Sequence, residues 1–262
     1  MKPSFKVVIP ARYESSRLPG KPLRLLAGKP MILHVCDRAL EAGAEEIIVA
    51  TDDHRIFDTV ESIGIQAVMT DSDHNNGSER IAEVARICGW QANAIVVNLQ
   101  GDEPLIPASA IQDVAKGVDF ETGVEVATLA APICDPHDVF NPNVVKVVLN
   151  FRGIAMYFSR AAIPWDRDQF GEDSPAHGLR GEYLRHIGMY AYSVGFLERY
   201  AEWKPTLLES VELLEQLRIL WYGEPLKVNI IEQAPEPGVD IEDDLKRVER
   251  ILKARQQGHT KA

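Results

Sequence analysis

The hydrophobic positions of the first 120 residues follow two alternating periods. Short apolar runs rich in β-branched residues predict buried strands at 5–10, 46–50, 66–69 and 94–99. Between them, apolar positions at helical spacing predict helices over 31–42, 53–63, 77–88 and 107–116. Strands and helices that alternate in this way build a parallel sheet covered by helices on both faces. This part of the chain is therefore predicted to be α/β.

After about residue 120 the strands follow one another more closely. Strands are predicted at 125–130, 144–149, 153–158, 188–193 and 227–231, with a hairpin turn at 150–153. Helices are predicted over 206–221 and 241–256, and a long loop rich in Gly, Pro, Asp and Arg over 164–180. Because no linker separates two domains, we expect one domain over 1–262, with the second half elaborating the first sheet.

Composition and charge narrow the class of protein. The 262 residues are 45% hydrophobic and 26% charged, which is typical of a soluble globular chain. Asp and Glu number 39 against 28 Lys and Arg, and the resulting net charge of −11 argues against nucleic acid and anionic membranes as partners. Three scattered cysteines, no signal-peptide pattern and no long apolar run predict a cytoplasmic protein without a membrane span.

A cationic loop follows the first predicted strand. The segment Pro10-Ala-Arg-Tyr-Glu-Ser-Ser-Arg-Leu-Pro-Gly-Lys-Pro22 places Arg12, Arg17 and Lys21 at the carboxyl end of a strand, where open α/β sheets bind ligands. Arginine forks and lysine point charges are the usual partners of phosphate. The segment matches neither the Walker pattern nor the dinucleotide fingerprint. It is a candidate phosphate loop of another kind.

Two carboxylates are candidates for a metal site. Asp102 follows the fourth predicted strand in Asn98-Leu-Gln-Gly-Asp-Glu-Pro104, at the same sheet edge as the cationic loop. Asp240 precedes the last predicted helix, where it would otherwise serve only as an anion in the first helical turn. A carboxylate beside phosphates repels them unless Mg²⁺ bridges the two. The sequence therefore indicates Mg²⁺ as cofactor.

Further polar residues suit an anionic or hydroxylated ligand. Arg80 lies at the start of a predicted helix, where a cation is unfavourable unless an anion is near. In the second half, hydrogen-bonding and cationic residues that suit a small polyhydroxy acid are Arg160, His186, Tyr190, Glu215 and Gln216. His186 fits a satisfied core histidine equally well. No zinc spacing and no Gly-x-Ser-x-Gly elbow is present.

In combination these segments resemble the 3-deoxy-manno-octulosonate (Kdo) cytidylyltransferase family over nearly the whole chain. The resemblance rests on the segments IPARYESSRLPGKPL, VNLQGDEPLIP, YFSRAAIPWDRD, LRHIGMYAY, ESVELLEQLRILWYGE and PGVDIEDDL. It implies a GT-A-like, Rossmann-type nucleotidyltransferase fold, a mixed central sheet covered by helices with a second-half β-elaboration. It also implies a cytoplasmic homodimer that transfers CMP from CTP to Kdo with Mg²⁺, for lipopolysaccharide synthesis.

The resemblance assigns a role to each candidate residue. It implies a nucleotide-binding half, 1–120, and a half for sugar-acid binding and dimerisation, 121–262. The nucleotide residues are Ala11, Arg12, Arg17, Lys21, Arg80 and Gln100, and the catalytic residues are Arg17, Lys21, Asp102 and Asp240. Asp102 and Asp240 are the metal ligands, and the sugar-acid residues are Arg160, His186, Tyr190, Glu215 and Gln216. The alternatives are a cytidylyltransferase for 8-amino-Kdo or a sialic-acid-like sugar, and a sugar-nucleotide-binding protein without turnover.

Overall fold

The computed structural model describes residues 4–15, 17–74, 77–170 and 178–259, with the last two residues described by their backbone alone. The chain forms two compact units, one of residues 1–112 and 235–262 and the other of residues 113–234. These units differ from the expected halves, because the C-terminal segment belongs with the first unit. The assignment of one domain to the whole chain stays a prediction. Among the described residues, no helix is both long and apolar enough to cross a bilayer.

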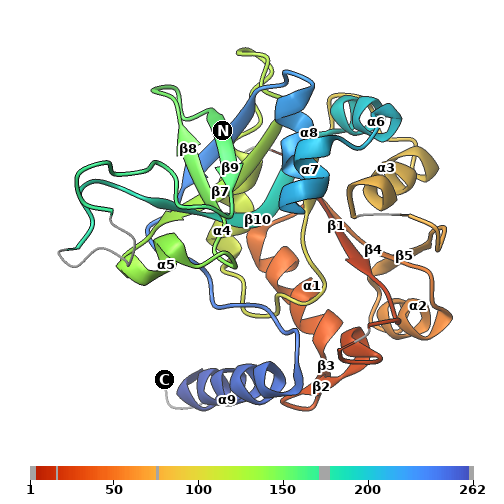
Figure 1. The fold of residues 1–262 in the computed structure, drawn as a ribbon. Coiled ribbons are helices and arrows are strands. Elements are labelled where there is room, and N and C mark those ends of the chain that lie inside the picture. Colours follow the sequence, from red (N-terminus) through yellow and green to blue (C-terminus); the bar gives the residue numbers. More distant parts are fainter. Residues whose placement is uncertain (1–3, 16, 75–76, 171–177, 260–262) are drawn as a thin grey trace. The chain divides into compact units, whose positions relative to one another are not determined.

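A parallel sheet forms the centre of the first unit (Figure 1). Its strands, in spatial order, are β6 (Ile95–Asn98), β1 (Lys6–Ala11), β4 (Glu46–Thr51) and β5 (Gln66–Met69). Every neighbouring pair is parallel, as the alternation of strands and helices predicted. Val7, Val8 and Ile9 of β1 are fully buried, as expected of a central strand covered on both faces.

Helices follow the strands of this unit. They are α1 (Met31–Ala42), α2 (His54–Glu61), α3 (Gly77–Ile87) and α4 (Ala108–Ala115), which crosses into the second unit. The predicted bounds of α1 are confirmed, and Gly43 ends the helix in a left-handed conformation with φ of 77°. Asp53 begins α2 as its N-cap, since its side chain accepts a hydrogen bond from the backbone N–H of Arg55.

A second layer of the first unit lies around its C-terminal helix. It comprises the one-turn helix η1 (Lys21–Leu23), the hairpin β2 (Leu25–Leu26) and β3 (Lys29–Pro30), and α9 (Glu242–His259). Figure 1 shows α9 beside this hairpin. Leu18 and Val239 are buried in one hydrophobic cluster with Leu245, Val248 and Leu252 of α9. The cationic loop and the turn before α9 are therefore anchored in the same core.

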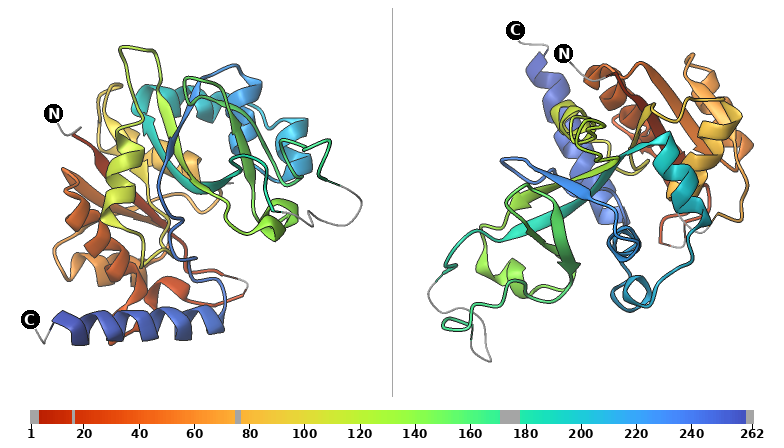
Figure 2. Two further views of the ribbon diagram at one scale, coloured as in Figure 1. Left: turned by 90° about the vertical axis from the view of Figure 1, so that its left-hand side faces the viewer. Right: turned by 90° about the horizontal axis from the view of Figure 1, so that it is seen from above.

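The second unit is built on a mixed sheet with short helices (Figure 2). Its strands are β7 (Val126–Pro132), β8 (Lys146–Leu149), β9 (Ala155–Ser159), β10 (Leu184–Ser193) and β11 (Leu226–Ile230). β7 pairs in parallel with β11 and antiparallel with β10, and β8 pairs antiparallel with β10 and β9. The hairpin turn predicted at 150–153 is confirmed, because the Asn150 side chain accepts hydrogen bonds from the N–H groups of Arg152 and Ile154.

The single helix predicted over 206–221 is wrong, because the structure has two helices there. α7 (Leu207–Glu212) and α8 (Gln216–Trp221) are separated at Leu213, whose φ is 51°. The reason is tertiary. Arg160 donates from Nε to the Glu212 carbonyl, and the Glu212 carboxylate accepts from the Ser159 hydroxyl and the Arg160 N–H. These contacts bind the backbone carbonyl and the carboxylate of Glu212, the last residue of α7, and the helix ends there.

Two helices of the second unit were not predicted. α5 (Pro136–Phe140) is capped by the Asp135 side chain, and α6 (Val194–Glu202) by the Ser193 hydroxyl, which accepts from the Phe196 N–H at 2.9 Å. The predicted strand 188–193 begins earlier, at Leu184. Of the loop expected over 164–180, residues 171–177 lie outside the described part of the chain.

Candidate active site

The cationic loop leaves β1 at the carboxyl edge of the parallel sheet and is held by its own backbone. The N–H of Gly20 donates to the Tyr13 carbonyl, and the N–H of Lys21 to the Leu18 carbonyl, both at 3.1 Å. Gly20 has a φ of +65°, and a Cβ there would lie 3.1 Å from the Tyr13 ring. Only glycine fits this turn without strain. Closure of the loop brings Arg17 and Lys21 back toward the sheet edge.

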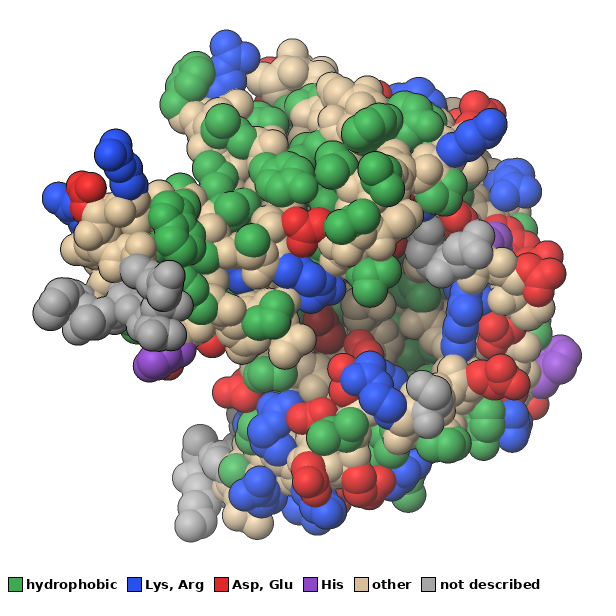
Figure 3. Space-filling model, in the orientation of Figure 1, with side chains coloured by type: hydrophobic (Ala, Val, Ile, Leu, Met, Phe, Trp, Pro, Cys, Tyr) green, Lys and Arg blue, Asp and Glu red, His purple; other side chains and the backbone are tan. Residues whose placement is uncertain are grey.

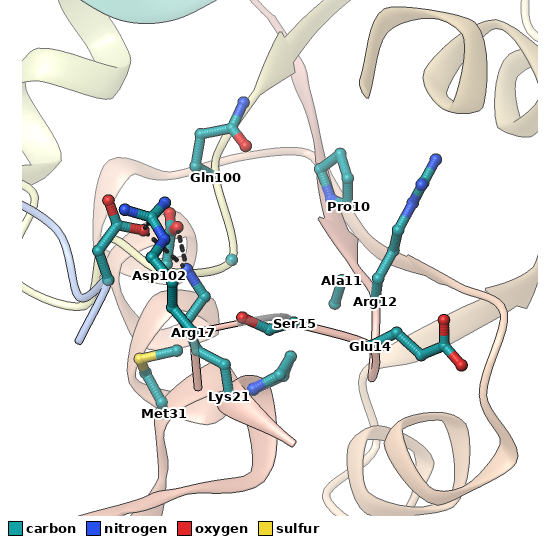
Figure 4. Close-up of a pocket in the computed structure, with 13 residues that line it drawn as sticks. Pro10, Ala11, Arg12, Glu14, Ser15, Arg17, Lys21, Met31, Gln100 and Asp102 are labelled. Carbon is teal, nitrogen blue, oxygen red and sulfur yellow. Dashed lines mark hydrogen bonds and ion pairs between the residues drawn. The ribbon is translucent and has the colours of Figure 1, made fainter. Parts of the chain in front are cut away.

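A pocket of about 330 Å³ lies inside this loop (Figure 4). All of its residues belong to the first unit. They are Pro10, Ala11, Arg12, Glu14, Ser15, Arg17, Lys21, Pro22, Met31, Gln100, Gly101, Asp102 and Asp240. Of the candidate nucleotide, catalytic and metal residues, all but Arg80 line this pocket. The sequence did not indicate Glu14, Ser15 or Met31 as pocket residues.

Lys21 connects the two candidate metal carboxylates. Its Nζ lies 2.7 Å from Asp102 Oδ2 and 3.3 Å from Asp240 Oδ1, and it donates to the Val239 carbonyl at 2.9 Å. Arg17 also approaches Asp240, at 3.3 Å. In Figure 4 the side chains of Arg17 and Lys21 lie on the Asp102 side of the pocket, and Arg12 lies on the other side, beside Pro10 and Ala11. Carboxylates that are 138 residues apart in the sequence thus contact a single cation.

Close backbone packing fixes these two acidic turns. A Cβ at Gly101 would lie 2.9 Å from the Pro10 carbonyl oxygen, and one at Gly238 would lie 2.9 Å from the Asp102 carbonyl oxygen. The Val239 N–H donates to that same Asp102 carbonyl at 2.9 Å. Such contacts leave no space for a side chain at either glycine. The turn before α9 is therefore attached directly to the turn that carries Asp102.

This arrangement fits a metal ion that is shared with a ligand. In the described ranges, no group of three or more His, Cys, Asp or Glu side chains is placed to hold a metal. The protein offers instead two hard carboxylate groups that already share one cation. Mg²⁺ is commonly bound in this way, by one or two carboxylates together with phosphate oxygens and water.

Glu103 is a feature of the site that sequence reasoning missed. Burial, and to a smaller extent the neighbouring charge of Asp102, raises the pKa of its carboxyl group to about 7. Its Oε2 has no hydrogen-bond partner among the described residues. Position next to Asp102 was the only signal in the sequence, and it does not report burial.

Arg80 lies deeper than the sequence indicated. Its side chain is 1% exposed, donates to the Thr70 hydroxyl and forms an ion pair with Asp52 at 3.0 Å. Burial lowers the pKa of its guanidinium group, and the Asp52 charge opposes that shift. The sequence indicated an anion beside this cation at the helix start, and the carboxylate of Asp52 supplies one. Gln100 lines the pocket, and its side-chain amide donates to Asn98 at 3.4 Å.

The sugar-acid candidates belong to the second unit. Arg160 donates to the carbonyls of Pro142, Glu212 and Leu213, so its guanidinium is engaged by the backbone. His186 and Tyr190 lie on β10, with ring centroids 5.6 Å apart. Burial lowers the pKa of His186 to about 3 and raises that of the Tyr190 hydroxyl. His186 is therefore neutral at physiological pH.

Two of these residues carry buried polar atoms that are unsatisfied. The Tyr190 hydroxyl and the Gln216 side-chain nitrogen have no partner at hydrogen-bond geometry within the described residues. Glu215 lies close enough to Tyr190 to raise the pKa of its hydroxyl group. Buried polar groups of native proteins are rarely left unpaired, so each such group indicates an absent partner.

A parallel α/β sheet with a cationic loop and paired carboxylates at its carboxyl edge defines a nucleotide-binding protein of the Rossmann-like class. The family model described as "Cytidylyltransferase" matches residues 6–230. The chain belongs to the cytidylyltransferase family, and within it to the family of 3-deoxy-manno-octulosonate cytidylyltransferases.

Relatives and a solved structure carry this assignment. A 3-deoxy-manno-octulosonate cytidylyltransferase of Idiomarina loihiensis is 53% identical over 95% of this chain and 98% of its own. That of Methylococcus capsulatus is 52% identical over 97% and 99%. A solved structure of a CMP:2-keto-3-deoxy-manno-octonic acid synthetase complexed with CTP is 40% identical, with a TM-score of 0.86 over 96% of this chain and 100% of that one.

Proposed function

We propose that the protein joins CTP and Kdo to give CMP-Kdo and pyrophosphate, which supplies an activated sugar for lipopolysaccharide synthesis. The observation that carries the proposal is the pocket at the cationic loop of the first unit, in which Lys21 contacts Asp102 and Asp240. The names of the close relatives supply the nucleotide and the sugar acid. Because CTP is an intracellular metabolite and the cysteines are unpaired, we propose a cytoplasmic enzyme.

The reaction needs no nucleophilic side chain of the protein. The anomeric hydroxyl oxygen of Kdo attacks the α-phosphorus of CTP, the bond from that phosphorus to the bridging oxygen breaks, and pyrophosphate leaves with the electron pair. The hydroxyl proton passes to water. Arg17 and Lys21 offset the negative charge on the phosphates, and the pocket holds the triphosphate in line for attack. Asp102 and Asp240 would hold Mg²⁺, which would supply Lewis acidity toward the phosphates when bound.

The remaining residues are proposed to select the two substrates. Ala11, Arg12, Arg80 and Gln100 are assigned to the nucleotide. Arg160, His186, Tyr190, Glu215 and Gln216 are assigned to the sugar acid, whose hydroxyl groups would satisfy the buried polar atoms of Tyr190 and Gln216. A neutral His186 suits a hydroxylated ligand better than a second cation would, since it both donates and accepts.

We expect pyrophosphate release only when CTP, Kdo and Mg²⁺ are all present. A coupled pyrophosphate assay on the full chain checks this, with UTP and GTP in place of CTP and a hexose phosphate in place of Kdo as controls. Equal turnover with either replacement contradicts the assignment. Faster turnover with 8-amino-Kdo or a sialic acid indicates the related cytidylyltransferase. Tight binding of CTP without turnover on any sugar acid indicates a binding protein.

We also propose that the protein is a homodimer through its second unit. No residue of α7 is buried, and Leu207 and Val211, one helical turn apart, are 73% and 72% exposed. Leu213 follows at 78%. Figure 3 shows hydrophobic side chains gathered over α7 and α8. A contiguous exposed apolar patch of this kind is typical of an interface.

Light scattering at micromolar concentration is expected to give twice the chain mass of 29.2 kDa. Introducing charge with Leu207→Lys and Val211→Glu is expected to reduce it to the single-chain value. Leu40→Lys is the matched control, because Leu40 is 57% exposed on α1 of the first unit. A monomeric wild type, or a dimer that survives both changes on α7, contradicts this interface.

A further inference from the structure

Every hydrogen-bond donor of the Lys21 side chain has an acceptor at the two carboxylates or at the backbone between them. Its ammonium group has three N–H donors. Their acceptors are Asp102 Oδ2 at 2.7 Å, the Val239 carbonyl at 2.9 Å and Asp240 Oδ1 at 3.3 Å. The side chain is only 15% exposed, against 52% for Asp240. In this conformation Lys21 is the cation that contacts both carboxylates.

A divalent ion bound to the same carboxylates would be repelled by this ammonium group. Like charges a few ångströms apart repel strongly in a partly buried pocket. Arg17, 3.3 Å from Asp240, adds a further positive charge. Entry of a metal ion alone therefore requires the lysine to give up at least part of its contacts without compensation.

The backbone that carries the two carboxylates is fixed, whereas the lysine side chain can rotate. Gly101 and Gly238 pack against backbone carbonyls at distances that leave no free space, and Val239 is hydrogen-bonded to Asp102. The Lys21 ammonium stands on a flexible four-carbon stem, whose rotation needs no change in the backbone. A triphosphate in the pocket offers this stem new acceptors of higher charge.

We propose that Lys21 occupies the carboxylate pair until a nucleotide triphosphate draws it away, so that the pair binds a divalent ion tightly only together with the nucleotide. The inference rests on the proposed function, because it takes the ligand of this pocket to be CTP. It makes Lys21 the link between the two ligands. Coupling of this kind is reciprocal, so the metal also strengthens nucleotide binding by the same factor.

Binding of Mn²⁺, which prefers the same oxygen ligands as Mg²⁺, tests the inference without turnover. Titration of the full chain with Mn²⁺ is followed by electron paramagnetic resonance, with and without CTP and always without Kdo. In the wild type, CTP is expected to tighten Mn²⁺ binding. Lys21→Met is expected to bind Mn²⁺ alone about tenfold more tightly than the wild type, and to lose the part of the CTP effect that comes from moving the lysine, while keeping the part that the phosphate ligands supply.

Lys29→Met is the matched control, because Lys29 also forms one short ion pair in the first unit, with Asp37 at 2.6 Å, but lies outside the pocket. It removes one positive charge and is expected to leave Mn²⁺ binding unchanged. Unchanged or weaker binding of Mn²⁺ to Lys21→Met overturns the inference, as does equal tightening by Lys29→Met.

Failure of the proposed function would be seen separately. If the wild type releases no pyrophosphate from CTP and Kdo while Lys21→Met still binds Mn²⁺ more tightly, the exchange of cations stands and the assigned reaction falls. If pyrophosphate is released but Lys21→Met gains no affinity for Mn²⁺, the reaction stands and the role of Lys21 as a competing cation is overturned.

Discussion

Asp102→Asn is expected to lower the rate of pyrophosphate release by about 100- to 1,000-fold at saturating CTP and Kdo. The change keeps the shape of the side chain but removes a charge that would hold Mg²⁺. Loss of a metal-held charge in the transition state costs roughly 3–4 kcal/mol, and each 1.36 kcal/mol is about tenfold in rate. Asp240→Asn is expected to behave similarly. The measurement is the pyrophosphate-release rate across a Mg²⁺ titration.

The double variant distinguishes one shared ion from two independent roles. Because Asp102 and Asp240 contact the same cation in the structure, the second change should add little to the first. Asp37→Asn is the control, since Asp37 pairs with Lys29 away from the pocket. Near-wild-type activity in either single variant, or fully multiplicative losses in the double variant, contradicts a shared ion.

Lys146→Met is expected to destabilise the protein by about 3 kcal/mol or more. Lys146 has no exposed surface, and its Nζ donates to the carbonyls of Asn141, Val144 and Arg160 at 3.0, 2.7 and 2.6 Å. Methionine has a similar volume but no donor, so one buried carbonyl and two partly buried ones lose a partner, at roughly 1–3 kcal/mol for a fully buried group and less for the others. The substitution also removes the desolvation penalty of a buried ammonium group, and this gain offsets part of the lost stability.

Thermal unfolding measures this effect, with an expected fall in Tm of about 6–12 °C for a chain of this size. Lys116→Met is the matched control, because the Lys116 side chain is 51% exposed and makes only a surface ion pair with Asp113. Surface pairs of this kind contribute about 0–1 kcal/mol. A Tm within 2 °C or so of the wild type for Lys146→Met would show that water replaces the ammonium group.

Local pattern was sufficient for regular elements whose apolar residues are buried. The helix 31–42 and the strand 66–69 were predicted with the bounds that the structure has, because the first has apolar residues at helical spacing and the second is a short apolar run whose Ala67 and Val68 are buried. The turn at 150–153 follows from Asn150 and Gly153, which act on their own neighbourhood. The candidate residues at strand ends were found for the same reason, since a parallel sheet gathers its carboxyl ends at one edge.

Where the sequence failed, a distant partner overrode a local preference. The periodicity of 206–221 is helical throughout, but Arg160 and Ser159 bind Glu212 and the chain turns at Leu213. Arg80 has the position of a ligand-facing cation, but Asp52 and Thr70, from the ends of two other strands, hold it inside the unit. Such partners lie many residues away and leave no periodic signal.

The sequence by itself determined the α/β class of the first unit, the loop that carries Arg12, Arg17 and Lys21, and the two acidic turns. Only the tertiary structure decided that Lys21 contacts both Asp102 and Asp240, that Arg12 lies apart from them, and that Glu103 is half-buried next to Asp102. The physical reason is that helices and strands are set by neighbours within a few positions. A contact between residues 219 positions apart depends on how the whole first unit closes.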